Sequence, residues 1–333
     1  MNTLHRRVSV ILTVRNDSKG CRLVLDSLLA QTRAPDEIVV VDAGSTDGTW
    51  ELLQNYAGAT PHLRIHSAPG ANIAQGRNLA TQHASGEIIA ATDGGCSAEP
   101  TWLERLVQPF DEDRATEFVA GLYRVSPYSL FESVVGLATM RGQLDPVDPR
   151  TFNPSGRSMA YTKDVWRRAG GFPEWVRFSE DTLFDLKLRQ LRVNWKTAPG
   201  AVVHWRPRCS FHSLAKQFYH YGTGRGHTQI GAPDFRYNLR NAGLVLLCAA
   251  GAAALPVLWG VVGAMTLYFY GWTFHPKAIR IARRLGNPKA YSLCFAVMWT
   301  VLVSNTAGYL VGTLQRLCHA RRYLSPIRAY MAT

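Results

Sequence analysis

The stretch EIVVVDAGSTDGT, residues 37–49, decides the fold class of this chain. It begins with an unbroken apolar run, Ile38–Val41, which is typical of a strand buried on both faces of a parallel sheet. Asp42 ends the run, and two glycines allow a turn before a helical pattern begins at Thr49. The stretch therefore indicates a strand, a loop and a helix, which is the repeating unit of a parallel α/β sheet.

The same alternation continues on both sides of this stretch. Val8–Val14 is another apolar run, and leucines at helical spacing follow it between residues 23 and 29. Further elements are predicted as helices at 49–56, 76–83, 102–110, 164–169 and 181–191 and as strands at 63–66, 87–92 and 201–204. We expect an α/β fold with a mostly parallel sheet and helices on both faces. Four prolines between Ala120 and Gly156 predict no long regular element there, and residues 206–240 are read as a basic, aromatic linker.

Polar clusters follow three of the predicted strands. They are Arg15–Asp17, Asp42–Thr49 and Asp93–Gly95. In sheets of this kind, ligands bind beyond the carboxyl ends of the strands. A carboxylate such as Asp42 can accept hydrogen bonds from a base or a ribose, and glycines let a ligand approach the backbone. Taken singly, each cluster is also compatible with an ordinary turn.

The C-terminal third differs in charge from the rest of the chain. The formal net charge is +13, and after Asp234 there are eleven Lys and Arg residues and no acidic residue. Two uncharged apolar segments, 242–274 and 290–314, lie between basic segments, and each exceeds the roughly 20 residues that span a bilayer. The first is long enough that we expect it to break near Pro256 or Gly260. This pattern favours a membrane partner over nucleic acid, with a buried helical hairpin of a soluble protein as the alternative.

The N-terminus and the cysteines bear on the compartment. The apolar run Val8–Val14 is too short for an export signal, and Arg15 ends it. The six cysteines show neither zinc-type spacing nor a disulfide framework. A reducing, cytoplasmic location is expected for the N-terminal part.

Together, these motifs resemble glycosyltransferase family 2, the inverting enzymes of the GT-A fold, over roughly residues 8–228. The segments that carry the resemblance are Val8–Leu12 leading to Asn16, Ile38–Thr49, Gly76–Asn78 ahead of Gly86–Ile89, Asp93, Gly170–Phe172 and Ser179–Asp181. Residues 216–222 are similar to the linker of membrane-bound enzymes of succinoglycan-type exopolysaccharide and glycolipid synthesis. The resemblance implies a Rossmann-like GT-A domain at 1–235 and a C-terminal region of transmembrane or membrane-associated helices at 236–333.

The resemblance also implies a nucleotide-sugar donor site. Its residues would be Asn16, Asp42, Gly44, Arg77 and Asp93. Asp42 would contact the nucleoside, Asp93 the ribose and the diphosphate with its metal, and Arg77 the phosphates. The family's second metal-binding Asp is replaced by Gly95, which puts the need for a metal in question. Asp93 and His204 would be the ligands of a divalent ion, Mg²⁺ or Mn²⁺.

For the acceptor side, the resemblance assigns Asp181 as general base and Glu180 as the residue that orients it. Acids in the first turn of a helix are the alternative explanation of this motif. Trp175 and Phe178, with Tyr161, are candidates for an apolar platform under an acceptor sugar, or else belong to the core. Gln217 is a further acceptor-side candidate. Since the Arg-Trp pair of processive synthases is absent, a single-addition enzyme is favoured.

The expected function is transfer of a sugar to a lipid-linked or saccharide acceptor in cell-envelope glycan or exopolysaccharide synthesis. The expected location is the inner membrane, multi-pass with two or three inserted helices and a cytoplasmic catalytic domain, with membrane lipid as a partner and no nucleic acid. One alternative is a membrane-anchored scaffold that binds nucleotide sugar without catalysis, which Gly95 favours. Another is a sugar nucleotidyltransferase, although the glycine-rich basic loop of those enzymes is absent from Val8–Gly20.

Overall fold

The structure is a computed structural model that describes residues 6–140, 154–252 and 254–332. By compactness the chain divides into two units. The first comprises Met1–Ser126, Val147–Arg206 and Pro326–Thr333, and the second comprises Pro127–Pro146 and Pro207–Ser325. Residues 207–235 thus fall in the second compact unit. The sequence-based boundary of the catalytic domain at residue 235 stays a prediction.

The first unit is built on an eight-stranded mixed sheet with the order β3-β2-β1-β4-β7-β6-β8-β5. The strands are β1 (Val8–Val14), β2 (Glu37–Asp42), β3 (Leu63–Ser67), β4 (Ile88–Ala91), β5 (Cys96–Ala98), β6 (Phe118–Val125), β7 (Met159–Thr162) and β8 (Trp195–Trp205). Neighbours among β1 to β4 pair in parallel, while β7 runs antiparallel to both β4 and β6. The expected α/β fold with a mostly parallel sheet is confirmed, and the antiparallel pairs of β7 and of β5 make the sheet mixed.

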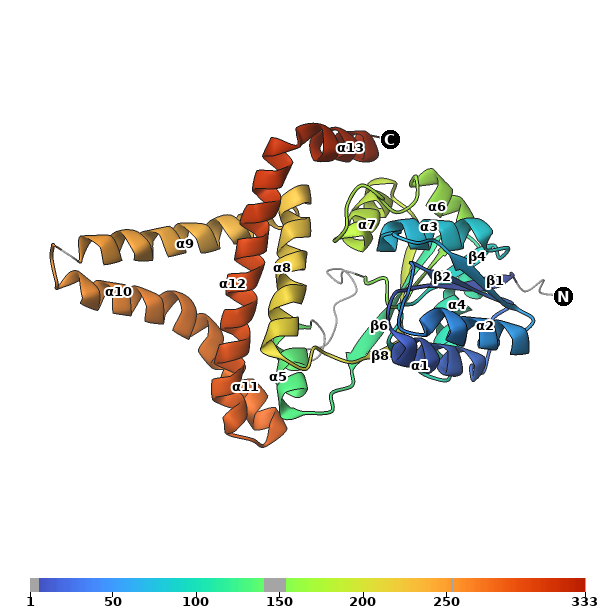
Figure 1. Cartoon of the computed structure of the whole chain (residues 1–333), viewed down its shortest axis with the longest axis horizontal. Helices are drawn as coiled ribbons and strands as arrows, with labels where there is room; N and C mark the ends of the chain where they lie inside the picture. Colours follow the sequence, from blue (N-terminus) through green and yellow to red (C-terminus); the bar gives the residue numbers. More distant parts are fainter. Residues whose placement is uncertain (1–5, 141–153, 253, 333) are drawn as a thin grey trace. The chain divides into compact units, whose positions relative to one another are not determined.

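Helices cover both faces of this sheet (Figure 1). They are α1 (Ser18–Leu29), α2 (Thr49–Ala59), α3 (Ile73–His83), α4 (Trp102–Glu112), α6 (Lys163–Arg168) and α7 (Glu180–Gln190). Successive side chains of a strand face opposite sides. In β1, Val10 and Leu12 join one hydrophobic core with residues of α1, α2 and α4, while Ile11 joins a second core with residues of α3, α6 and α7. Burial on both faces explains why the strands are apolar without alternation.

The middle of the chain is more regular than the sequence suggests. The prediction of no long regular element between Ala120 and Gly156 is wrong, because β6 continues to Val125 and α5 (Leu130–Thr139) is a ten-residue helix. The reason is local. No proline lies between Pro127 and Pro146, and the Ser129 hydroxyl accepts a hydrogen bond from the backbone N–H of Glu132, which caps the helix. The prolines Pro146 and Pro149 lie outside the described residues.

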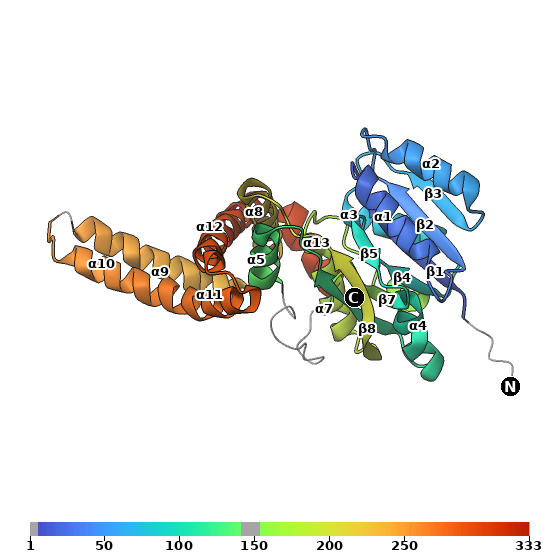
Figure 2. The ribbon, with the colours of Figure 1, turned by 90° about the horizontal axis from the view of Figure 1, so that it is seen from below.

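The second unit is helical. It contains α5, α8 (Phe211–Thr228), α9 (Ala232–Gly251), α10 (Leu258–Thr266), the π-helical turn η1 (Leu267–Gly271), α11 (Trp272–Leu285), α12 (Lys289–Cys318) and the start of α13 (Ala320–Ala332). The predicted linker at 206–240 is therefore largely helical. Helices α8 and α12 lie side by side in Figures 1 and 2. A Cβ added at Gly222 or Gly226 of α8 would overlap the backbone of α12, and one at Gly308 or Gly312 of α12 would overlap that of α8. Only glycine permits this approach.

One described helix, α12, is long and apolar enough to cross a membrane. It contains the predicted apolar segment 290–314. The predicted segment 242–274 is divided among α9, α10, η1 and α11, and its helix breaks between Gly251 and Leu258, around the expected Pro256. We expected two or three inserted helices. Among the described residues, one helix meets the length and composition criterion for spanning a membrane.

Candidate active site

Two strand-end loops meet around Asp42, the last residue of β2. Its Oδ1 atom accepts hydrogen bonds of 2.8 Å from the backbone N–H groups of Gly44 and Ser45. Gly44 has a φ of +85°, a conformation that favours glycine. The other oxygen, Oδ2, is buried and has no hydrogen-bond partner among the described residues. Since a buried carboxylate oxygen without a partner is unfavourable, it is suited to receive an N–H or O–H group from a ligand.

Asn16 connects this loop to the end of β1. Its side-chain Oδ1 accepts a 2.8 Å hydrogen bond from the backbone N–H of Thr46, and its own N–H donates to the Ser45 hydroxyl at 2.8 Å. Asn16 has a φ of +51°, which asparagine tolerates better than most residues. The role of Asn16 visible in the structure is to hold the two loops together.

Arg77, on α3, joins two parts of the site that are far apart in sequence. One guanidinium nitrogen lies 2.7 Å from Asp93 Oδ1, after β4, and the other lies 2.8 Å from Glu180 Oε1, at the start of α7. Arg77 is 3% exposed, so this contact is inside the protein. The predicted donor-side residues Arg77 and Asp93 and the predicted acceptor-side residue Glu180 are thereby brought into one ionic network.

The surroundings of Arg77 fix its position. Its guanidinium lies 5.5 Å from the ring centroid of Phe172, and a Cβ added at Gly156 would overlap the guanidinium. Arg157, the next residue, lies over the rings of Tyr123 and Trp205. Sequence reasoning missed Arg157, and the only signal for it was a Gly-Arg pair following the proline-rich segment.

The charged groups of this network shift one another's pKa values. Burial alone would raise the pKa of Asp93, but the cations of Arg77 and Arg157 outweigh it and lower that pKa. Burial, with the neighbouring charge of Asp181, raises the pKa of Glu180 to about 7 in spite of Arg77. Two anions flank Arg77, and its pKa is raised although burial opposes this. Asp93 is therefore an ionised group near neutral pH, and Glu180 titrates there.

Asp181 lies in the first turn of α7 and is partly exposed. Its Oδ1 atom accepts a 2.7 Å hydrogen bond from the backbone N–H of Thr182. A carboxylate at a helix N-terminus is stabilised by the helix dipole, so Asp181 also fits the alternative explanation that it stabilises the start of α7. The position leaves Asp181 accessible beside a site whose other acid, Glu180, is committed to Arg77.

A third acid on α7 escaped the sequence reasoning. Asp185 is fully buried, and neither of its carboxylate oxygens has a hydrogen-bond partner among the described residues. Burial first, and the charge of Asp181 second, raise the pKa of Asp185 well above its usual range. Its spacing of four residues from Asp181 places both acids on one face of the helix, which the sequence pattern could have indicated.

The acceptor-side aromatic residues occupy different environments. Tyr161 is fully buried in the core beside Phe172 and Phe184, which matches the core interpretation of this residue. Trp175 and Phe178 are half-buried, so they stay candidates for a sugar platform. Gln217 belongs to the second unit, where its side chain donates a 2.9 Å hydrogen bond to the Tyr221 hydroxyl.

The predicted metal ligands do not form a cage. The described residues hold no group of three or more His, Cys, Asp or Glu side chains placed to bind a metal. His204 instead lies 3.0 Å from Glu99 Oε1. Gly95 has a φ of +76°, and a Cβ added there would lie 3.1 Å from Asp17 Oδ2. Because Mg²⁺ often takes one or two protein carboxylates and completes its shell with substrate phosphates and water, Asp93 alone fits an ion held mainly by a diphosphate.

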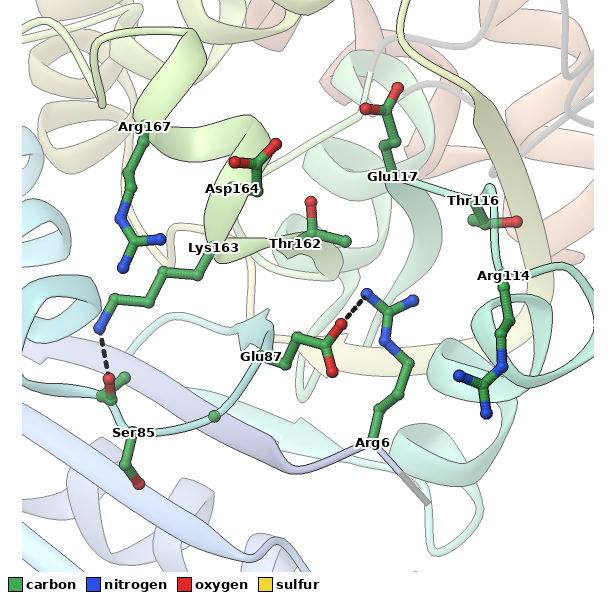
Figure 3. Close-up of a pocket in the computed structure, with 12 residues that line it drawn as sticks. Arg6, Ser85, Glu87, Arg114, Thr116, Glu117, Thr162, Lys163, Asp164 and Arg167 are labelled. Atoms are coloured by element: carbon green, nitrogen blue, oxygen red, sulfur yellow. Dashed lines mark hydrogen bonds and ion pairs between the residues drawn. The ribbon is translucent and has the colours of Figure 1, made fainter. Parts of the chain in front are cut away.

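A cavity of about 480 Å³ lies where β1 and β4 begin and β7 ends, away from the strand-end loops of β1, β2 and β4. Figure 3 shows the residues that line it. Residues before β1 and β4 and after β7 line it, among them Arg6, Glu87 and Lys163. Arg6 pairs with Glu87 at 2.7 Å, and the Lys163 ammonium donates to backbone carbonyls. None of the site residues predicted from sequence lines this cavity, so it is separate from the strand-end site.

Comparisons with known proteins agree with this fold. Residues 9–156 match the family described as Glycosyl transferase family 2. The glycosyltransferase AglE of Haloferax volcanii is 37% identical over 103 residues, which cover 29% of this chain and 33% of that protein. The uncharacterized glycosyltransferase EpsJ of Bacillus subtilis is 28% identical over 189 residues, covering 54% of this chain and 55% of that protein. The chain therefore spans a third to just over half the length of these relatives.

A solved structure shares the fold over most of the chain. It is the mannosyltransferase PcManGT from Pyrobaculum calidifontis in complex with GDP-Man and Mn²⁺, with a TM-score of 0.58, 22% identity and coverage of 94% of this chain and 88% of that chain. The mixed sheet and this structural similarity define a protein of the GT-A fold class. Residues 9–156 resemble the glycosyl transferase family 2 domain.

Proposed function

We propose that this protein is an inverting glycosyltransferase, which moves a sugar from a nucleoside-diphosphate sugar to a hydroxyl group of a lipid-linked or saccharide acceptor. The observation that carries the proposal is the buried Arg77 bridge, because it joins the donor-side carboxylate Asp93 to the acceptor-side helix α7. The family 2 domain and the GT-A fold support the same class of reaction.

The donor would bind at the carboxyl ends of β1, β2 and β4. The unpartnered Oδ2 of Asp42 is suited to accept a hydrogen bond from the nucleobase, and Asn16 and Gly44 shape the loop beside it. Arg77 and Arg157 supply positive charge near Asp93. The negatively charged diphosphate of the donor would bind beside these cations. These cations would stabilise the leaving nucleoside diphosphate as its bond to the sugar breaks.

A divalent ion is part of the proposal. Mg²⁺ or Mn²⁺ held by Asp93 and the donor diphosphate would add further positive charge at the leaving group. The mannosyltransferase structure that shares this fold contains Mn²⁺. His204, with its contact to Glu99, is a weaker candidate ligand than Asp93.

The chemical step would take place at the start of α7. Asp181 would accept the proton of the acceptor hydroxyl while that oxygen attacks the anomeric carbon from the face opposite the diphosphate. The glycosidic bond forms as the bond to the diphosphate breaks, and the configuration inverts. Glu180, fixed by Arg77, would keep the first turn of α7 in position for this step. Trp175 and Phe178 would contact the acceptor.

Membrane association is also part of the proposal. The acid-free C-terminal region and the apolar helices of the second unit favour a bilayer with anionic lipids on its cytoplasmic side, where nucleotide sugars are made. We place the catalytic unit on the cytoplasmic face of the inner membrane, in cell-envelope glycan or exopolysaccharide synthesis.

The test is nucleotide release by the purified full chain with a panel of nucleoside-diphosphate sugars, with and without a membrane lipid extract. We expect release from one donor, and a rise in rate when the extract supplies acceptor. Donor binding by calorimetry with no release under any condition would identify a scaffold and overturn the proposal. A requirement for a nucleoside triphosphate would identify a nucleotidyltransferase and overturn it equally.

A further inference from the structure

The hairpin formed by α9, α10 and η1 exposes a long apolar surface. Between Ala242 and Tyr268, Ala252 is the one buried residue among those that the structure describes. Leu247 is 70% exposed and Val257, near the tip, is 77% exposed. Helix α10 contributes no buried residue at all. A surface this apolar is unfavourable in water, and it marks a place where the protein meets another apolar phase.

Both arms of the hairpin are shorter than the hydrocarbon core of a bilayer. The apolar part of α9, Ala242–Gly251, is ten residues long and extends about 15 Å at 1.5 Å per residue. The hydrocarbon core of a bilayer is about 30 Å thick, so one leaflet contributes about 15 Å. In Figures 1 and 2, α9 and α10 lie side by side, joined at a tip that contains Pro256. The α9 arm is thus too short to cross a bilayer and long enough to enter one leaflet. The second arm, Leu258–Gly271, extends about 21 Å, which is also shorter than the core.

The register of the two arms places interfacial residues at one level. The Cys248 sulfur lies 3.8 Å from the Met265 sulfur, which fixes the antiparallel pairing. Seven residues farther from the tip than this pair, Asn241 lies on α9 and Trp272 lies on the other arm. Arg240 is the next residue on α9. Tryptophan and arginine side chains are favoured at the headgroup level of a bilayer. Trp272 is 77% exposed, as this position requires.

The charges beyond that level complement an anionic lipid surface. Basic residues flank both arms, at Arg236 and Arg240 on α9 and between Lys277 and Arg284 on α11, and no acidic residue follows Asp234. Attraction between such basic segments and anionic headgroups adds to the apolar contribution.

Helix α12, although long enough to span, is poorly suited to do so. The glycines Gly308 and Gly312 pack it tightly against α8, and the His227 ring nitrogen lies 2.8 Å from Gln315 Oε1. The two helices run in parallel, so Lys216 and Arg225 of α8 lie alongside the apolar middle of α12. A crossing by α12 would therefore carry these charged residues into the hydrocarbon, which is costly.

We propose that the α9–α10 hairpin inserts tip-first into a single leaflet of a phospholipid bilayer, and that α12 does not cross it. The protein is then held on one side of the membrane without any crossing. This inference rests on the membrane association proposed above and is independent of the transferase activity.

The first experiment compares two matched substitutions in the full chain. Flotation with vesicles of phosphatidylcholine and phosphatidylglycerol measures binding of Leu247→Asp, on the hairpin, and of Val303→Asp, at a 59% exposed position of α12. We expect Leu247→Asp to lose roughly tenfold or more of the bound fraction and Val303→Asp to float like the parent, since a carboxylate is excluded from hydrocarbon. The reverse order would assign insertion to α12 and overturn the proposal, as would equal binding of both variants and the parent.

The second experiment tests crossing. In a chain whose native cysteines are replaced, and which floats and melts like the parent, Ala254→Cys places one thiol at the tip. A membrane-impermeant maleimide should label it slowly from either side of sealed vesicles, and quickly after detergent. Fast labelling from the side opposite the catalytic unit would show a crossing, and fast labelling from the same side would show no insertion. Either result overturns the proposal, while nucleotide release by the same preparation reports separately on the transferase.

Discussion

The Arg77 guanidinium lies 2.8 Å from the Glu180 carboxylate, across a sequence separation of 103 residues. Both side chains are almost fully buried, and the second guanidinium nitrogen pairs with Asp93 at 2.7 Å. Removing one partner of a buried ion pair leaves the other charge without compensation. The relationship therefore links the stability of the first unit to the geometry of its site.

Arg77→Lys tests this link. A lysine has one ammonium group and cannot form both contacts in the planar arrangement of a guanidinium, so one carboxylate loses its partner. We expect a loss of about 3 kcal/mol in the free energy of unfolding. The control is Arg168→Lys, at a surface ion pair with Glu117 where the arginine is 43% exposed, for which we expect about 1 kcal/mol or less. Urea unfolding of both variants measures the difference, and equal losses would contradict a special role for Arg77.

Glu180 predicts a pH dependence of stability. Burial and Asp181 raise its pKa to about 7 from the ordinary value of 4.5, so between these values the folded state binds more protons than the unfolded state. Stability contributed by this group is then present at the acidic end and falls as the pH rises through the window. Glu180→Gln cannot titrate. We expect the melting temperature of the parent, relative to the variant, to fall between about pH 5 and pH 8. Parallel curves for the two chains would show that Glu180 titrates normally.

Gly95→Asp tests the missing carboxylate. The φ of +76° makes any side chain strained there, and the new Cβ would lie 3.1 Å from Asp17 Oδ2, which adds repulsion between two acids. We expect the variant to melt below the parent without metal and to gain more in melting temperature than the parent when Mn²⁺ is added. Gly95→Ala is the control, because it carries the backbone strain without the carboxylate. An equal response of Asp and Ala variants to Mn²⁺ would place position 95 outside any metal site.

Local sequence patterns predict much of the fold. Apolar runs such as Ile38–Val41 identify strands buried on both faces, and the polar residues that follow them, Asp42 and Asp93, lie at the strand ends as expected. The contacts that complete the site are different in kind. The fold brings Arg157 close enough to Asp93 for its charge to lower the pKa of that carboxyl group. The pairing of α8 with α12 depends on glycines that are far apart in the sequence, such as Gly222 and Gly308. Such relationships depend on tertiary packing and leave no periodic signal in the sequence.

The length of the apolar segments shows the same limit. Residues 242–274 satisfy the length criterion for a spanning helix, yet the turn around Pro256 divides them into two arms, each below the roughly 20 residues that span a bilayer. Hydrophobicity alone indicates that a segment avoids water. Where the helix breaks, and what packs beside it, decides how deep it can go.

The most direct test of the account is the rate of sugar transfer by Asp181→Asn at saturating donor. Asparagine keeps the size and hydrogen bonding of Asp181 but cannot accept the proton of the acceptor hydroxyl, and a positioned base contributes about 10²–10⁴-fold to such a reaction. Calorimetric donor binding and a thermal melt are the controls, and both should match the parent because the strand-end loops are untouched. We predict a fall in transfer within that range with unchanged donor affinity. A variant that transfers sugar within about threefold of the parent rate would contradict the assignment of Asp181 as general base.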